Sequence, residues 1–131
     1  MFVNMENTQL GTTIEQSEKL IKAGLSQDTA DLHYNNASYK GPNYDEVLAL
    51  SNYPYTKALQ LYQDTGFTGS LFFKCIPAWS ISKLWDILHE NGVNTTPSST
   101  AMNSERLLEF LVNRVIYSIN CGYIDKTFLA H

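Results

Sequence analysis

The stretch CIPAWSISKLW, Cys75 to Trp85, places a proline and two tryptophans around two serines, and it decides the fold. Ser80 is a good helix N-cap, because its hydroxyl can accept a hydrogen bond from an amide of the first turn. Trp79 then precedes the cap and Leu84 is the fourth helical residue, a pairing known as a hydrophobic staple. We predict a helix that begins after Ser80, and structural roles for Trp79, Ser80, Leu84 and Trp85, with both tryptophans buried.

Glycines mark the ends of four predicted helices on either side of this stretch. Each follows a helix-compatible run and precedes an apolar or aromatic residue, as in a Schellman motif; they are Gly24, Gly66, Gly92 and Gly122. The last helix is expected over residues 104–121, and its many apolar residues predict a central position.

Helix starts are also visible in the sequence. A capping box can form at Thr12 with Glu15 or at Thr13 with Gln16, and either would begin the first helix. Apolar residues at helical spacing after Pro54 predict the second. The sequence therefore predicts two helices before the one that begins in the opening stretch, and one helix after it.

Short apolar runs predict the strands of a small sheet. The two clearer runs are EVLAL (46–50) and SLFFKCI (70–76), and a weaker one is DLHYNNASY (31–39). We predict a helix-dominated α+β fold, with about four helices packed around or beside a small, short-stranded β-sheet. Residues 1–12 are expected to be a flexible N-terminal segment, and residues 13–131 a single globular domain.

Composition narrows the classes of function. The 131-residue chain has a formal charge of −4 and its nine Lys and Arg residues are spread out, which argues against binding to duplex nucleic acid. The most apolar uncharged run, residues 115–124, is shorter than the roughly 20 residues of a membrane-spanning helix. With no secretory signal, we expect a cytoplasmic protein without a membrane partner. We also expect Cys75 and Cys121 to be reduced, partly buried thiols, and the glycosylation sequons at Asn36 and Asn94 to be accidental.

Three segments resemble a known family. They are TIEQSEKLIKAGLSQDTAD from Thr13, IPAWSISKLWDIL from Ile76 and, more faintly, LLEFLVNRVIYSINCGYI from Leu107. They are similar to small uncharacterised bacterial proteins, often carried on mobile or prophage-like elements, with the motifs TIEQS-KLI-AGL and IPAWS-S-L. The family has no assigned activity or catalytic residues, so the resemblance implies a genetic context and no chemistry. The chain differs from it in having twelve residues before the first helix.

One loose group of residues could support an enzyme. The carboxylates of Asp28 and Asp31 and the imidazole of His33 are ligand types that can share a divalent metal, which would suit a small hydrolase. The structural alternative is that Asp28 caps a short helical turn and that His33 is solvent-facing or satisfied by hydrogen bonds. We expect no cofactor, because the sequence lacks the common phosphate-, dinucleotide- and zinc-binding motifs.

Tyrosine and asparagine are concentrated between residues 34 and 62, where the formal charges cancel. Tyrosine offers a large contact area at low entropic cost, and asparagine adds adjustable hydrogen bonds, as on protein recognition surfaces. We predict a non-enzymatic interaction module that contacts another protein or a second copy through Tyr39, Tyr44, Tyr53 and Tyr55. Alternatively, these rings edge a sheet and cover the core, or stack on single-stranded nucleic acid, although a basic groove for the latter is missing.

Overall fold

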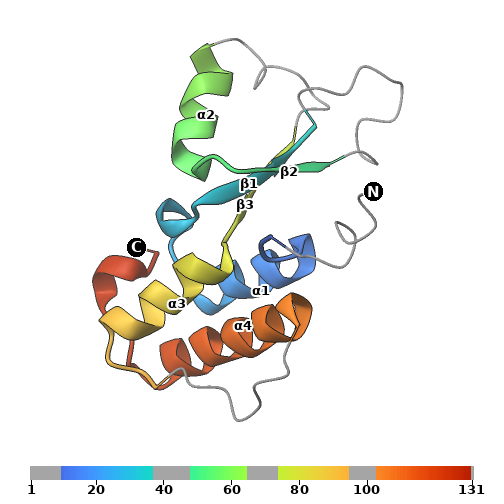
Figure 1. Ribbon diagram of the computed structural model, residues 1–131. Coiled ribbons are helices and arrows are strands. Elements are labelled where there is room, and N and C mark those ends of the chain that lie inside the picture. Colours follow the sequence, from blue (N-terminus) through green and yellow to red (C-terminus); the bar gives the residue numbers. More distant parts are fainter. Residues whose placement is uncertain (1–9, 37–47, 65–73, 95–102, 131) are drawn as a thin grey trace.

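The computed structural model describes residues 10–36, 48–64, 74–94 and 103–130 (Figure 1). Within them lie four α-helices and three strands, so the predicted helix-dominated α+β fold is confirmed. The helices are α1 (Ile14–Ala23), α2 (Tyr55–Asp64), α3 (Ile81–Glu90) and α4 (Ser104–Asn120), and short 3₁₀ helices occupy η2 (Gln27–Thr29) and η5 (Lys126–Phe128). The strands are β1 (Leu32–Asn35), β2 (Ala49–Ser51) and β3 (Cys75–Ala78). No helix within these four stretches is both long enough and apolar enough to cross a membrane.

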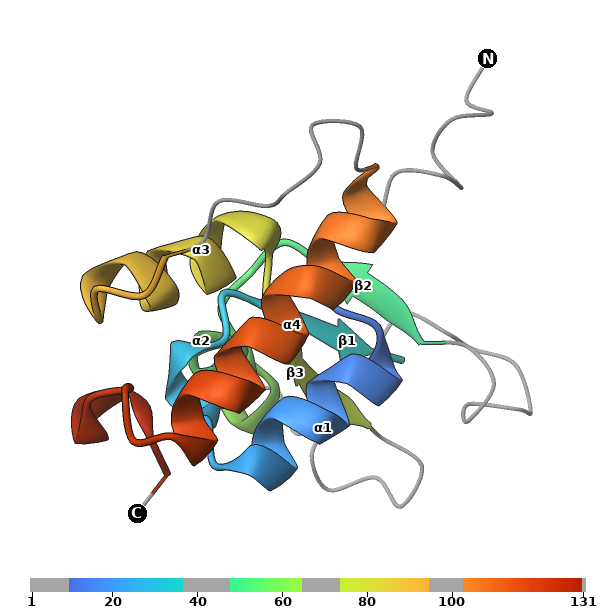
Figure 2. The ribbon, with the colours of Figure 1, turned by 90° about the horizontal axis from the view of Figure 1, so that it is seen from below.

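The sheet separates two unequal helical layers. Its strand order is β2-β1-β3 with both pairings antiparallel, so β1 is central although it is the weakest strand in the sequence. Helix α2 lies on one side, and α1, α3 and α4 lie on the other (Figure 1). Seen from the second side, α4 lies in front of α1 and α3 (Figure 2). The main apolar core is therefore on the three-helix side, as its buried members from α1, α3 and α4 indicate.

The strands are displaced from the predicted runs. Strand β2 ends one residue beyond the run at 46–50, and β3 extends two residues beyond the run at 70–76, through Pro77. Proline is tolerated there because β3 pairs with β1 on one side, and an edge strand can lack an N–H donor. Residues 46–47 of the first run, 70–73 of the second and 37–39 of the third lie outside the described residues.

The helix caps follow the local sequence. Of the two possible capping boxes, the second forms: the Thr13 amide donates to Gln16 Oε1 at 2.9 Å, and the Gln16 amide donates to Thr13 Oγ1 at 3.0 Å. The glycine endings are confirmed at three positions, with φ angles of 114°, 71° and 79° at Gly24, Gly92 and Gly122. Gly66 lies outside the described residues.

The folded domain begins earlier than residue 13. Gly11 and Thr12 are buried, and Gly11 forms a β-bridge with Ser80. A Cβ added to Gly11 would collide with Leu32 Cδ1 and lie 3.0 Å from the Trp79 carbonyl oxygen, so a side chain here would require Leu32 to shift. Gly11 and Thr12 therefore pack against the fold just ahead of α1.

The opening stretch acts as predicted at Trp79. The indole is fully buried, as is Leu84, and both belong to the core cluster. Ser80 is the N-cap of α3 and accepts from the Lys83 amide at 3.0 Å. Trp85 is only partly buried at the edge of this cluster, which corrects the expectation that both tryptophans are buried alike.

Candidate functional site

Two of the three predicted metal ligands have separate local environments. Asp31 lies before β1, and its carboxylate accepts from the backbone amide and the hydroxyl of Ser80. Asp28 is exposed in η2, and the cap of that turn is Ser26, whose hydroxyl accepts from the Asp28 amide at 3.3 Å. The prediction that Asp28 caps the turn is therefore wrong by two residues.

The third predicted ligand, His33, is buried in a hydrogen-bonded network between β1 and α2. Its Nδ1 lies 2.8 Å from the Tyr53 carbonyl oxygen, which only accepts, so Nδ1 carries the proton. In the neutral ring, Nε2 then accepts from the Tyr62 hydroxyl at 3.0 Å and from the Asn35 amide at 2.9 Å. Both ring nitrogens are engaged, as one structural alternative predicted.

The described residues do not form the expected metal site. They contain no group of three His, Cys, Asp or Glu residues placed to hold a metal ion. His33 would also have to give up its bonds to Tyr62 and Asn35 before Nε2 could bind one. The alternative built on Asp28, Asp31 and His33 therefore has no geometric support in the described part of the chain.

Three of the four described tyrosines in the tyrosine-rich segment are partly buried. The Tyr34 hydroxyl donates to the Thr12 carbonyl oxygen at 2.9 Å, and the Tyr62 hydroxyl bonds to His33. Tyr55 is partly buried against the core. Burial raises the pKa of all three phenols. Tyr53, with 44 % of its surface exposed, is the described tyrosine of this segment that is open to contact.

Tyr39 and Tyr44, the other two candidate contact residues, lie outside the described residues. The structural alternative, in which the rings cover the sheet and the core, fits Tyr34, Tyr55 and Tyr62. The recognition hypothesis for this segment now depends chiefly on Tyr53.

A second exposed aromatic group lies at the end of α4, and sequence reasoning missed it. Tyr117 and Tyr123 are 55 % and 58 % exposed. Tyr123 also lines a groove of about 350 Å³, together with Arg114 and residues 91–94. One signal for Tyr117 was present in the sequence, since residue 117 falls opposite the apolar stripe of its helix.

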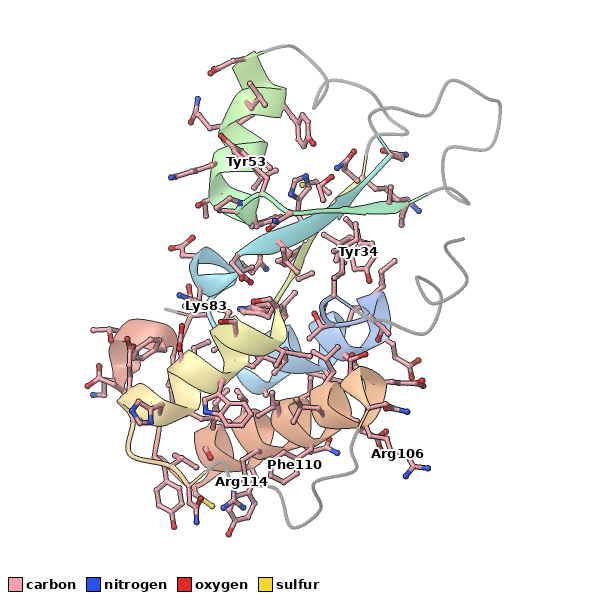
Figure 3. The ribbon with its side chains drawn as sticks, viewed as in Figure 1. Tyr34, Tyr53, Lys83, Arg106, Phe110 and Arg114 are labelled. Atoms are coloured by element: carbon pink, nitrogen blue, oxygen red, sulfur yellow. The ribbon has the colours of Figure 1, made fainter. Side chains whose placement is uncertain are left out.

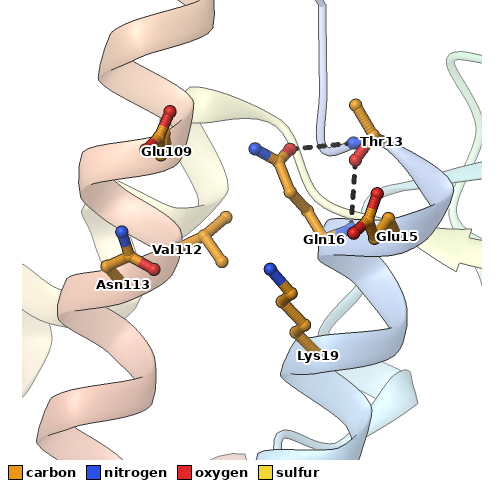
Figure 4. Close-up of a pocket in the computed structure, with 7 residues that line it drawn as sticks. All are labelled: Thr13, Glu15, Gln16, Lys19, Glu109, Val112 and Asn113. Atoms are coloured by element: carbon orange, nitrogen blue, oxygen red, sulfur yellow. Dashed lines mark hydrogen bonds between the residues drawn. The ribbon is translucent and has the colours of Figure 1, made fainter.

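Another groove, of about 260 Å³, lies between α1 and α4 (Figure 4). Its floor is Val112, and the amine of Lys19 points into the space between the helices, with Glu109 and Asn113 on the opposite wall. Gln16 also lines it but uses its carbonyl oxygen in the capping box of α1. The groove could hydrogen-bond a small polar molecule, but most of its groups are exposed side chains with no preformed arrangement.

None of three comparisons, with protein-family models, curated proteins and solved structures, finds a match to this chain. The resemblance to bacterial mobile-element proteins therefore stays a prediction from the sequence.

Proposed function

We propose that this chain is a protein-interaction module whose main contact surface is at the C-terminal end of α4. The observation that carries the proposal is the pair Tyr117 and Tyr123, which are each more than half exposed, together with the groove of about 350 Å³ that Tyr123 lines. Tyrosine is enriched at interfaces because it combines a large, rigid contact area with a hydroxyl. We call Tyr117, Tyr123 and this groove the α4-end surface.

The walls of the groove are held in place before any partner arrives. The Asn91 side chain bridges two segments, donating to the Ile87 carbonyl oxygen at 2.6 Å and accepting from the Asp125 amide at 2.8 Å. On the other wall, Arg114 Nε donates to the Asn94 carbonyl oxygen at 3.3 Å. A preorganised surface binds more tightly because less conformational entropy is lost on association.

The segment predicted from sequence remains a second candidate contact surface. Tyr53 is 44 % exposed, and its backbone is anchored because its carbonyl oxygen accepts from His33. Anchoring of this kind would let the Tyr53 ring contact a partner without ordering the loop first.

Native mass spectrometry of the tagged chain, purified from its own cells, tests the proposal. The wild type should retain a stoichiometric protein partner or a second copy, and Tyr117→Ser with Tyr123→Ser should lose it while melting as the wild type does. Leu61→Ser is the matched control, because Leu61 is a similarly exposed side chain, at 50 %, on α2.

A Tyr53→Ser variant tests the second surface separately. Loss of the partner from this variant alone would move the contact to the tyrosine-rich segment. A wild-type protein that stays monomeric and carries no protein partner would contradict the proposal as a whole.

A further inference from the structure

The outer face of α4 carries both arginines of the chain. Arg106 and Arg114 lie eight residues apart with Phe110 midway, and the spacing of four residues places the three on one side of the helix. This side is opposite the fully buried Leu108 and Val115. The three labelled side chains extend from the side of α4 that faces away from the sheet (Figure 3). We call Arg106, Phe110 and Arg114 the arginine ridge.

The ridge is cationic although the chain is acidic, with a formal charge of −4. Among the described residues, neither guanidinium pairs with a carboxylate. Within the same residues, the guanidinium groups make one hydrogen bond, from Arg114 Nε to the Asn94 carbonyl oxygen. Glu109 borders the ridge on the flank facing α1, where it also lines the α1/α4 groove. Two guanidinium groups are therefore available to carboxylates from outside the described chain.

Phe110 supplies the apolar part of the ridge. Its ring is partly buried, and it lines a shallow groove of about 300 Å³ with Arg106, Glu109 and Asn113. An aromatic ring between two cations offers one apolar contact flanked by two charged ones. Arginine suits the two charged contacts, because its planar guanidinium binds a carboxylate through two parallel hydrogen bonds.

We infer that the arginine ridge binds an acidic segment of a partner protein, with an apolar side chain seated on Phe110 between two carboxylates. Eight helical residues span about 12 Å, so the two acids should be about 12 Å apart. That spacing corresponds to about eight residues in a helical segment or about four in an extended one. The inference rests on the proposed function and names the partner class, since Tyr117 continues the same face toward the α4-end surface.

Charge complementarity favours an acidic protein segment over a nucleic acid. Two cations on a chain of charge −4 provide little counterion release, which dominates binding to phosphate backbones. Glu109 beside the ridge would repel a continuous phosphate chain, whereas separate carboxylates can avoid it.

A display library of random 16-residue peptides, selected on the immobilised full chain, tests the inference and needs no identified partner. Enriched peptides should carry acids on both sides of an apolar residue, and their binding should weaken as salt is added. Arg106→Glu with Arg114→Glu should reduce the affinity of the enriched peptides by at least about tenfold. Arg106→Glu alone should reduce it as well, and this variant keeps the Arg114 bond to Asn94.

The matched control is Lys22→Glu with Lys57→Glu, because it makes the same change in net charge at exposed positions on α1 and α2. It should alter affinity less than about twofold. Equal losses in the two double variants, or enriched peptides without acids, would overturn the inference. Tighter binding of an oligothymidine probe than of the selected peptides would overturn it in favour of nucleic acid.

The proposed function fails in a different way from this inference. If the cellular partner is lost from the Tyr117 and Tyr123 variant but kept by the Arg106 and Arg114 variant, the interaction module stands and the acidic partner does not. If neither variant changes partner retention, both proposals fail.

Discussion

Both oxygens of the Asp31 carboxylate accept hydrogen bonds from Ser80, one from its backbone N–H at 2.9 Å and the other from its hydroxyl at 2.5 Å. Ser80 is the N-cap of α3, where the helix dipole favours a negative charge. Asp31 therefore fastens the chain entering β1 to the start of α3. This contact gives a structural role to a residue that the sequence suggested as a metal ligand.

Replacing Asp31 should destabilise the fold. Asp31→Ala leaves two donors of Ser80 without their charged acceptor, so we expect a loss of about 1.5–3 kcal/mol in the free energy of unfolding, measured with urea. Asp28→Ala is the control, because Asp28 is exposed, and it should change stability by less than about 0.5 kcal/mol. Equal losses in the two variants, or a melting temperature that zinc raises in the wild type only, would favour the metal site instead.

Trp79 should act through stability. Its side chain is fully buried, and its indole N–H donates to the Thr29 hydroxyl at 2.8 Å. Trp79→Ala should cost about 3–5 kcal/mol in urea unfolding, because it removes the largest side chain of the core. Trp85→Ala should cost clearly less, since Trp85 is only partly buried. A Trp79→Ala protein that unfolds like the wild type would disprove this role.

Phenylalanine substitutions at Tyr62 and Tyr53 should have different effects on stability, because Tyr62 is hydrogen-bonded to a buried side chain and the Tyr53 ring is exposed. Tyr62→Phe removes a hydroxyl that bonds to the buried His33 ring, so we expect a loss of about 0.5–1.5 kcal/mol. Tyr53→Phe should leave stability unchanged within about 0.5 kcal/mol, because Tyr53 contacts His33 only through its backbone carbonyl. Chemical unfolding followed by circular dichroism gives both values. A larger loss for Tyr53→Phe than for Tyr62→Phe would contradict the hydrogen bond between the Tyr62 hydroxyl and His33.

The two cysteines should differ in reactivity. Burial raises the pKa of the Cys75 thiol to about 11, whereas the side chain of Cys121 is exposed. The expectation that both thiols are partly buried is therefore wrong at Cys121. At pH 8 only about one Cys75 in a thousand is then a thiolate, so iodoacetamide should modify Cys121 first. Peptide mass spectrometry over a time course measures both rates, and protein unfolded in guanidinium is the control in which the difference disappears. Similar rates in the folded protein would contradict the prediction.

The raised pKa of Cys75 also determines how the free energy of unfolding changes with pH. The folded protein keeps this proton up to about pH 11, while the thiol has an ordinary value of 9.0. The contribution of the Cys75 thiol to the free energy of unfolding is therefore fully present below pH 9 and declines as the pH rises toward 11.

Much of the helical framework could be predicted because its signals are local. Thr13, Ser80 and Asn103 cap α1, α3 and α4 through side chains that reach amides three residues away, and such contacts depend on neighbouring residues alone. The glycine endings at Gly24, Gly92 and Gly122 are local in the same sense, since each needs a positive φ at one position.

The strands were harder to place because β pairing joins distant residues. The central strand β1 mixes Leu32, His33, Tyr34 and Asn35, so it shows no apolar run. The buried imidazole of His33 in this strand bonds to the hydroxyl of Tyr62, which is 29 positions along the chain. The residues of the strand itself do not indicate this partner.

The candidate surfaces show the same division. The sequence by itself determined which side chains are available for contacts, namely tyrosines in an acidic chain with two arginines. It also determined the helix that carries Arg106, Phe110 and Arg114 on one face. Only the tertiary structure decided that Tyr34 and Tyr62 turn inward while Tyr117 and Tyr123 stay exposed. The reason is physical: periodicity specifies which residues share a face, but burial of that face depends on which distant element packs against it.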